Sequence, residues 1–224
     1  MDRIIVVCAG GHGAVVADIL QCARHEGEEL TAIGFVDDTP ELLGTTIAGL
    51  PVLGPISALP TIDHDAIVVA IGENSIRRTM MERLVADGER LAAAVHPRAT
   101  VAATARIGEG VVISAGAIVQ PGVTIGRGVI LNTRCSVDHD STVGDFAHLS
   151  PGATVGAHVH IGEEALIALG ASVIARRRVG ARTLIGAGAV VVRDIPDDVI
   201  AFGNPARIRS ARAPELVAGL SPRP

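Results

Sequence analysis

The chain has 224 residues, of which 48% are hydrophobic and only 1% aromatic; its formal net charge is -5, and its 19 basic side chains are all arginine. That length and apolar fraction suffice for a substantial core built from Val, Ile, Leu and Ala. The negative charge and the lack of a basic, aromatic-rich face argue against a nucleic-acid partner, and no apolar stretch approaches the ~18 residues that would span a bilayer.

The three cysteines, Cys8, Cys22 and Cys135, are few, odd in number and widely spaced. This pattern indicates reduced thiols rather than a disulfide framework. The chain also runs directly into the strand-like segment RIIVV without a signal-peptide pattern. We therefore expect a cytoplasmic protein.

The first ninety or so residues alternate between strand and helix patterns. After the apolar run comes a glycine-rich turn, then a helical pattern from about Ala14, and TAIGFVDD predicts a second strand that ends at Asp37 and Asp38. The segment DAIVVAIGENS predicts a third strand ending at Gly72, and SIRRTMMERLVADG predicts the helix after it. We expect residues 1–92 to form a small parallel, Rossmann-like α/β domain that binds its ligand at the carboxyl ends of the strands.

The glycine-rich turn of this domain departs from the dinucleotide fingerprint. In the pattern Gly11-x-Gly13-x-x-Val16 the third glycine is missing, which disfavours a nicotinamide cofactor. Glycines still let a phosphate approach a helix N-terminus, and Asp37 or Asp38 would accept hydrogen bonds from a base or ribose. A tight turn and a solvated acidic corner, without a ligand, are the alternative interpretation.

From Val95 onward the chain repeats every six residues. Seventeen consecutive hexads each begin with Val, Ile or Leu, and the fifth position is nearly always small or β-branched. A period of six fits neither a helix nor a simple strand but is typical of a hexapeptide β-helix, in which three hexads close one coil. Five to six coils would make a prism roughly 27 Å long. We expect this domain to cover residues 93–200 and to be followed by a tail, residues 201–224.

The fifth position of each hexad should point into the core, and two residues at this position need comment. Cys135 occupies it, so we expect that thiol to pack in the core. Arg177 occupies it too, in the hexad VIARRR, so either this side chain turns outward or the coil is distorted there.

Four histidines and three aspartates gather between Ser136 and Gly162, against a background of glycine, alanine and valine. Because coils of eighteen residues advance about 20° per residue, His139 and His148 should lie on opposite sides of one prism. A site that contains both must then lie between subunits. His158 and His160 are interpreted as surface residues.

Several of these segments in combination carry a family resemblance. The motifs VVCAGGHG, GFVDD and VAIGENSIRR, the hexads containing ILNTRCSVDHDSTVGDFAHLSPGATVGAHVHIG, and the closing AFGNPAR resemble the NeuD/PglD family of bacterial sugar acyltransferases over roughly residues 3–209. The resemblance implies a left-handed parallel β-helix and a homotrimer with acetyl-CoA in the groove between neighbouring helices, without a metal. It also implies N-acetylation of the 4-amino group of a UDP- or GDP-linked deoxy amino sugar, in bacterial glycan or glycoconjugate synthesis.

The resemblance also implies roles for individual residues. His139 is the expected general base, because imidazole titrates near neutral pH, and the family motif favours Asp140 over Asp138 as its acidic partner. Acetyl-CoA contacts are implied for His148, Ala157, Leu169, Gly170 and Ala187. Arg176 and Arg178 would meet coenzyme A phosphates unless they form a solvated corner. Substrate contacts are expected for Gly11, His12, Gly13, Asp37, Asp38, Gly72 and Asn74.

Three alternatives remain open at this point. The enzyme could instead O-acetylate sialic acid or a related sugar. The solenoid could merely trimerise a non-catalytic domain that binds sugar nucleotides. A gamma-type carbonic anhydrase would also be a hexapeptide trimer with histidines between subunits, but the histidine spacing of its zinc site is missing here.

Overall fold

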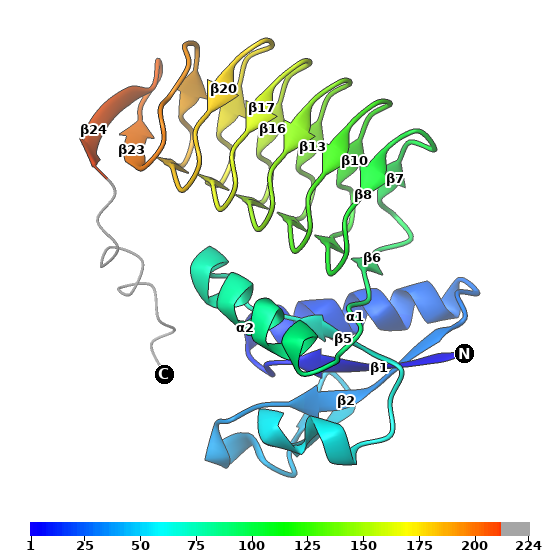
Figure 1. Ribbon diagram of the computed structural model, residues 1–224. Coiled ribbons are helices and arrows are strands. Elements are labelled where there is room, and N and C mark those ends of the chain that lie inside the picture. The colour runs from blue at the N-terminus through cyan, green and yellow to red at the C-terminus, as the bar shows by residue number, and fades with distance from the viewer. Residues whose placement is uncertain (212–224) are drawn as a thin grey trace.

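The computed structural model describes residues 1–211, which form an α/β domain followed by a three-sided prism of short strands (Figure 1). The α/β domain contains a five-stranded sheet in the order β3-β4-β2-β1-β5. Its strands are β1 (Asp2–Val7), β2 (Leu30–Val36), β3 (Thr46–Ile47), β4 (Leu50–Gly54) and β5 (Ala66–Val69). Its helices are α1 (Gly11–His25), α2 (Asn74–Ala86) and two short 3-10 turns, η1 (Pro40–Leu42) and η2 (Ile56–Thr61).

The sheet is buried on both faces, which is why its central strands are continuously apolar. Ile4 and Val6 of β1 pack with α1 on one face, whereas Ile5 and Val7 pack with η2 and α2 on the other. The parallel order of β2, β1 and β5 confirms the predicted domain type. The antiparallel hairpin of β3 and β4 was not expected from the sequence, α1 begins at Gly11 rather than Ala14, and β5 ends at Val69 rather than Gly72.

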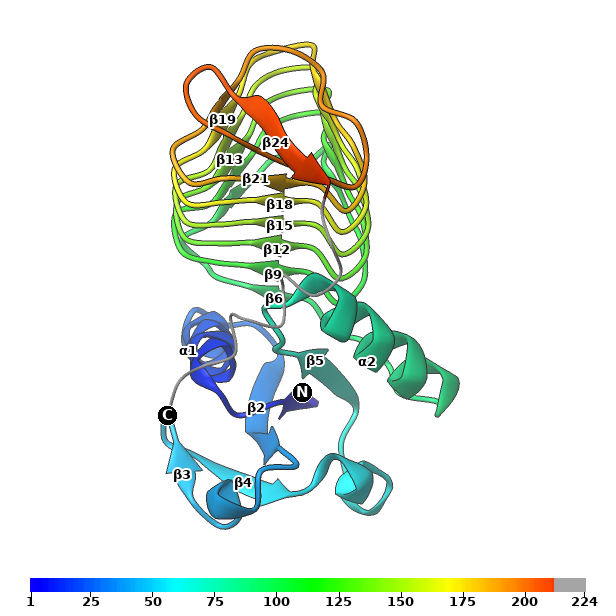
Figure 2. The same cartoon turned by 90° about the vertical axis from the view of Figure 1, so that its left-hand side faces the viewer.

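The prism has three walls of stacked parallel strands, named here after their middle strands (Figure 2). The β13 wall contains β7 (Thr100–Val101), β10 (Ile118–Val119), β13 (Ser136–Val137), β16 (Thr154–Val155), β19 (Ser172–Val173) and β22 (Val190–Val191). The β14 wall contains β8 (Arg106–Ile107), β11 (Thr124–Ile125), β14 (Thr142–Val143), β17 (His160–Ile161) and β20 (Arg178–Val179). The β15 wall contains β6 (Ala94–Val95), β9 (Val112–Ile113), β12 (Ile130–Leu131), β15 (His148–Leu149), β18 (Leu166–Ile167), β21 (Leu184–Ile185), β23 (Val199–Phe202) and β24 (Arg207–Ala211).

Each coil takes the eighteen residues that the hexads predict. Ser136 pairs with Thr154 and His148 pairs with Leu166, one coil later in each case. The inward side chains form one continuous aliphatic cluster that includes Cys135, which is fully buried as expected. Arg177 does turn outward: its side chain is 36% exposed and its guanidinium lies 3.9 Å from Asp194.

The end of the prism differs from the expected tail. β23 pairs with β21, and β24 folds back antiparallel onto β23, so residues 201–211 continue the β15 wall instead of leaving it. The rest of the predicted tail, residues 212–224, lies outside the described residues. Neither α1 nor α2, the longer helices of the described part, has an apolar stretch of bilayer-spanning length.

Candidate active site

The turn between β13 and β14 carries a histidine–carboxylate pair. His139 Nδ1 lies 2.8 Å from Asp140 Oδ2, and Asp140 adopts a left-handed backbone conformation with φ of 57°. Asp138 instead accepts a hydrogen bond from the His139 backbone N–H, at 2.8 Å. Asp140 is therefore the carboxylate that holds the ring, and the Nε2 atom of His139 is left to face solvent or a substrate.

The contact between His139 and Asp140 shifts the pKa values of both side chains. The hydrogen bond to Asp140 raises the pKa of His139 above its ordinary value and lowers the pKa of Asp140. A carboxylate in contact with Nδ1 favours the tautomer whose Nε2 carries a lone pair, and it stabilises the imidazolium that forms when Nε2 takes a proton. The pair has the arrangement of a general base with its orienting acid.

His158 joins this corner from the next coil. Its Nε2 lies 3.9 Å from Asp140 Oδ2, and its ring centroid lies 5.2 Å from that of His139 in an edge-on arrangement. His158 and His160 are both exposed, as expected. The proximity of His158 to the pair was missed, although the eighteen-residue register places it directly over Asp140.

His148 lies elsewhere, on the β15 wall, where the α/β domain meets the prism. Burial, followed by the nearby Arg77 and His12, lowers its pKa to about 3, while a hydrogen bond with the Gly72 backbone acts in the opposite direction. Asn132 Nδ2 lies 3.3 Å from its Nε2. His148 is thus a neutral ring at physiological pH. Because the corner that holds His139 joins the other two walls, the two histidines lie on opposite sides of the prism, as predicted.

The glycine-rich turn opens beside this interface at the start of α1. A Cβ at Gly13 would lie 2.3 Å from the Cys8 carbonyl oxygen, so the tight approach of helix to strand requires glycine, whereas Gly11 has open space around it. No side chain caps α1, whose first-turn N–H groups therefore suit an anion. His12 sits among them, its pKa lowered to about 4 by burial and by Arg77, and its Nε2 is buried without a partner among the described residues.

Asp37 and Asp38, two of the expected substrate contacts, accept hydrogen bonds from backbone N–H groups in the loops of the α/β domain. Asp37 accepts hydrogen bonds from the backbone N–H groups of Ala9, at 2.7 Å, and Thr39, at 2.8 Å. Burial opposes ionisation of Asp37, but these bonds outweigh it and lower its pKa. Asp38 accepts from the Ile56 N–H at 2.9 Å, which ties the end of β2 to η2. Both carboxylates retain lone pairs for a ligand.

Asn74 has a different role from the expected substrate contact. Its side-chain Nδ2 donates to the carbonyls of Glu164, at 2.9 Å, and Ala165, at 3.3 Å, and its Oδ1 accepts from Arg77. Both of its donors are used and the residue is buried, so its amide joins α2 to the prism. The sequence motif gave no sign of this because the partners are backbone groups ninety residues away.

The expected coenzyme contacts fall on two separate corners of the prism. Ala157 lies one coil after His139, and the exposed Arg176 lies one coil after His158 on the same corner. Leu169, which is 60% exposed, lies with Gly170 and Ala187 on the corner between the β15 and β13 walls. Arg178 lies 3.5 Å from Asp197. A single chain therefore does not bring the expected coenzyme contacts together.

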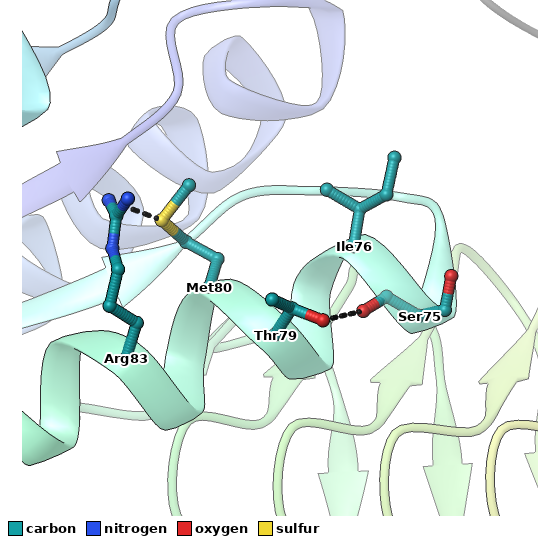
Figure 3. A pocket seen from close by; sticks show the side chains of 5 residues that line it. All are labelled: Ser75, Ile76, Thr79, Met80 and Arg83. Carbon is teal, nitrogen blue, oxygen red and sulfur yellow. Dashed lines mark hydrogen bonds between the residues drawn. The ribbon is translucent and has the colours of Figure 1, made fainter.

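Two hollows flank the exposed side of α2. One is a groove on the helix itself, lined by Ser75, Ile76, Thr79, Met80 and Arg83 (Figure 3). The other shares Arg83 and extends past η2 to Asp38 at the end of β2. Neither hollow is lined by His139 or His148.

Comparisons with known proteins cover both parts of the chain. Residues 3–84 match the family model of the PglD N-terminal domain. UDP-N-acetylbacillosamine N-acetyltransferase of Bacillus subtilis is 37% identical over 116 residues, which are 51% of this chain and 52% of that protein. The match thus spans about half the length of this curated relative.

Solved structures match over nearly the whole chain. The acetyltransferase domain of PglB from Neisseria gonorrhoeae is 40% identical with a TM-score of 0.85, and the match covers 93% of this chain and 100% of that one. PerB from Caulobacter crescentus, solved with CoA and GDP-perosamine, is 37% identical with a TM-score of 0.85, over 94% of this chain and 98% of that one. From its α/β domain to the end of its left-handed β-helix, this chain belongs to the NeuD/PglD family of sugar acyltransferases.

Proposed function

We propose that this protein transfers the acetyl group of acetyl-CoA to the 4-amino group of a nucleotide-linked deoxy amino sugar, in the cytoplasm, for glycan synthesis. The observation that carries the proposal is the His139–Asp140 pair, a poised base on the corner of a β-helix whose α/β domain offers a phosphate-binding turn. Two relatives support it: UDP-N-acetylbacillosamine N-acetyltransferase of Bacillus subtilis, and perosamine N-acetyltransferase of Caulobacter crescentus, a variant of which was solved with CoA and GDP-perosamine.

His139 acts as the general base of this reaction. The sugar amine attacks the thioester carbonyl carbon, and its proton passes to His139 Nε2 as the new C–N bond forms. The C–S bond then breaks, and the imidazolium, held by Asp140, returns the proton to the departing thiolate. His148 cannot serve as a second base because its pKa lies near 3; its neutral ring, hydrogen-bonded to the Gly72 backbone, lines the thioester side of the site.

The complete site requires a second copy of the chain. His139 and His148 lie on opposite sides of one prism, and the expected coenzyme contacts occupy two of its corners. In a cyclic trimer, the His139 corner of one protomer faces the β15 wall of the next, with acetyl-CoA in the groove between them. Arg176 and Arg178 are placed to meet coenzyme A phosphates, while Ala157, Leu169, Gly170 and Ala187 line the pantetheine.

The α/β domain holds the sugar nucleotide. The uncapped first turn of α1, at Gly11, His12 and Gly13, binds the phosphates. Asp37 and Asp38, at the end of β2, accept hydrogen bonds from the base or ribose, and the Gly72 loop closes the other side. This arrangement directs the sugar toward the β15 wall, where His148 lies.

The test is release of thiol from acetyl-CoA with a panel of UDP- and GDP-linked 4-amino sugars, together with free sialic acid. We expect release with a nucleotide amino sugar and a loss of ~10²–10⁴-fold in His139→Ala, the usual cost of removing a general base. The variant must retain the oligomeric state of the parent protein, measured by light scattering.

Each other outcome contradicts a defined part of the proposal. Thiol release with sialic acid alone would make the protein an O-acetyltransferase. Binding of a sugar nucleotide without any thiol release would make it a binding protein. Unchanged turnover in a correctly assembled His139→Ala variant would remove His139 from the mechanism.

A further inference from the structure

Three side chains at the exposed histidine corner offer converging ligand atoms for a metal ion. His139, Asp140 and His158 each present one ligand atom, and these atoms all lie within 4.8 Å of one another. Among them, Asp140 Oδ2 lies 2.8 Å from His139 Nδ1 and 3.9 Å from His158 Nε2. The carboxylate oxygen therefore stands between two imidazole nitrogens.

The donor set matches zinc. Two imidazole nitrogens and one carboxylate oxygen are ligands that Zn²⁺ accepts at about 2.0–2.2 Å, with a water completing a tetrahedron. Two imidazoles on one tetrahedral zinc would have their ring centroids about 5 Å apart, as follows from those bond lengths, and the observed centroid separation is 5.2 Å. The side chains are about half exposed, so small rotations suffice to bring the ligand atoms into range.

The ligand atoms of a second cluster, Asp18, Cys22 and His96, also lie within 4.8 Å of one another, but the histidine of this cluster is buried. His96 Nδ1 accepts a hydrogen bond from the Arg98 backbone N–H at 2.9 Å, so in the neutral ring the proton lies on Nε2. Because His96 is buried, its ring is less free to turn toward a metal than the exposed rings of His139 and His158. The exposed corner is the better site.

We propose that His139, Asp140 and His158 form a zinc site whose occupation inhibits the enzyme. The metal takes the place of the proton between His139 Nδ1 and Asp140. A neutral imidazole bound through Nδ1 carries its remaining proton on Nε2, so no lone pair is left there to accept the proton of the amine. The zinc is thus an antagonist of proton transfer and has no part in the reaction.

The inhibitory effect rests on the proposed function, but metal binding does not, and the two are tested separately. Binding is measured by calorimetric titration of the full chain with ZnCl₂, without substrates, in a buffer that does not chelate metals. We expect one zinc per chain, at least tenfold weaker binding in His158→Asn, and no binding of Mg²⁺, which prefers an all-oxygen octahedron.

His160→Asn is the matched control. His160 is exposed, lies two residues after His158 and is outside the cluster, so its replacement should leave zinc affinity unchanged. In the acetyl-transfer assay, zinc should inhibit the parent protein and His160→Asn, and a chelator should restore their activity. His158→Asn should keep its turnover and require at least tenfold more zinc for the same inhibition.

The outcomes distinguish this proposal from the proposed function. Zinc affinity in His158→Asn equal to that of the parent would overturn the site. An active acetyltransferase that takes up no zinc would overturn the site alone and leave the function standing. Zinc that binds here without slowing acetyl transfer would overturn both the inhibition and the role of His139 as base.

Discussion

At the scale of single residues, the surroundings of the two principal histidines give them opposite properties. His139 stands on a half-exposed corner with one carboxylate in contact, and its pKa is raised. His148 is enclosed between two domains near Arg77 and His12, and its pKa falls to about 3. The His139 ring can therefore accept a proton near neutral pH, whereas the His148 ring stays neutral. The surroundings of each histidine, and not the residue type, therefore determine whether its ring can act as a base.

Asp140→Asn tests how the charge on Asp140 tunes His139. The acetyl-transfer rate requires neutral His139, so the acid limb of the kcat/KM profile follows its pKa. The substitution would remove the contact that contributes most to raising that pKa, so we expect the acid limb to move to lower pH. The plateau rate should also fall, by less than the ~10²–10⁴-fold loss expected when the base itself is removed.

The matched control for this prediction is Asp138→Asn. Asp138 also raises the pKa of His139, but it does so through its charge and not through a hydrogen bond to the ring, so its replacement should shift the limb less. Profiles of kcat/KM against pH for the three proteins provide the comparison. An acid limb that stays in place in Asp140→Asn would show that the ionisation observed is not that of His139.

At the scale of elements, the hexads predicted the coils because a β-helix repeats one environment many times. Every coil needs an apolar residue at the same inward positions, so the period is visible in the sequence alone. Several hexads, such as IGRGVI and VGDFAH, also carry glycine at their second position, but the sequence does not reveal why. A Cβ at Gly126, Gly144 or Gly162 would lie 2.4–2.7 Å from a backbone nitrogen of the next coil. Only the stacked structure reveals that the coils touch there.

The attachment of α2 to the prism could not be predicted, because its partners are backbone carbonyls. Arg77 is fully buried, and its guanidinium donates to carbonyls of Gly128, at 2.7 Å, and Phe146, at 2.7 Å, on successive coils. It also donates to the carbonyls of Ile71, at 2.9 Å, and Gly72, at 3.2 Å. A sequence pattern identifies an arginine on a helix but carries no information about acceptors of this kind.

Arg77→Met tests this attachment. Methionine keeps an apolar stem but leaves several buried carbonyls without donors, and each such loss costs about 1–3 kcal/mol. We expect the free energy of unfolding to fall by about 3 kcal/mol or more, and KM for the sugar nucleotide to rise because the Gly72 loop loses its support. Denaturant titration and steady-state kinetics measure the two effects.

Arg78→Met is the control for this prediction, since Arg78 is the next residue of α2. Its side chain is 39% exposed and pairs with the half-exposed Glu82 and the largely buried Glu164, so its loss should cost less stability than the loss of the fully buried Arg77. Equal losses of stability in the two variants would show that the buried guanidinium does not hold the domains together.

At the scale of the whole molecule, the contact between the domains determines where the site can be. The outward residues Ala94, Val112 and Ile130 of the β15 wall are fully buried in the core of the α/β domain. The next outward position along that wall is His148, so the apolar contact ends where the polar site begins. The sequence predicted both domains but not their docking, because docking depends on surface shape rather than on a repeated pattern.

This docking makes the stability of the molecule sensitive to acid. The folded protein holds His12 with a pKa of about 4 and His148 with a pKa of about 3, both below the ordinary value of 6.5. As pH falls below 6.5, the unfolded chain binds protons at both rings while the folded protein does not, so stability falls. Each ring contributes up to about 1.4 kcal/mol per pH unit until its folded pKa is reached, and neither contributes above about pH 7.

Comparison of variants isolates this effect from His139, whose raised pKa acts in the opposite direction. Denaturant unfolding of the parent protein at pH 7 and pH 5 should show a loss of stability at the lower pH. His148→Gln, which cannot titrate, should show a smaller loss, and His160→Asn, altered at an exposed ring, should match the parent. A His148→Gln protein as acid-sensitive as the parent would mean that His148 takes up a proton in the fold as readily as in the unfolded chain. It could then serve as a charged donor to the thioester oxygen, and the division of roles between the two histidines would have to be revised.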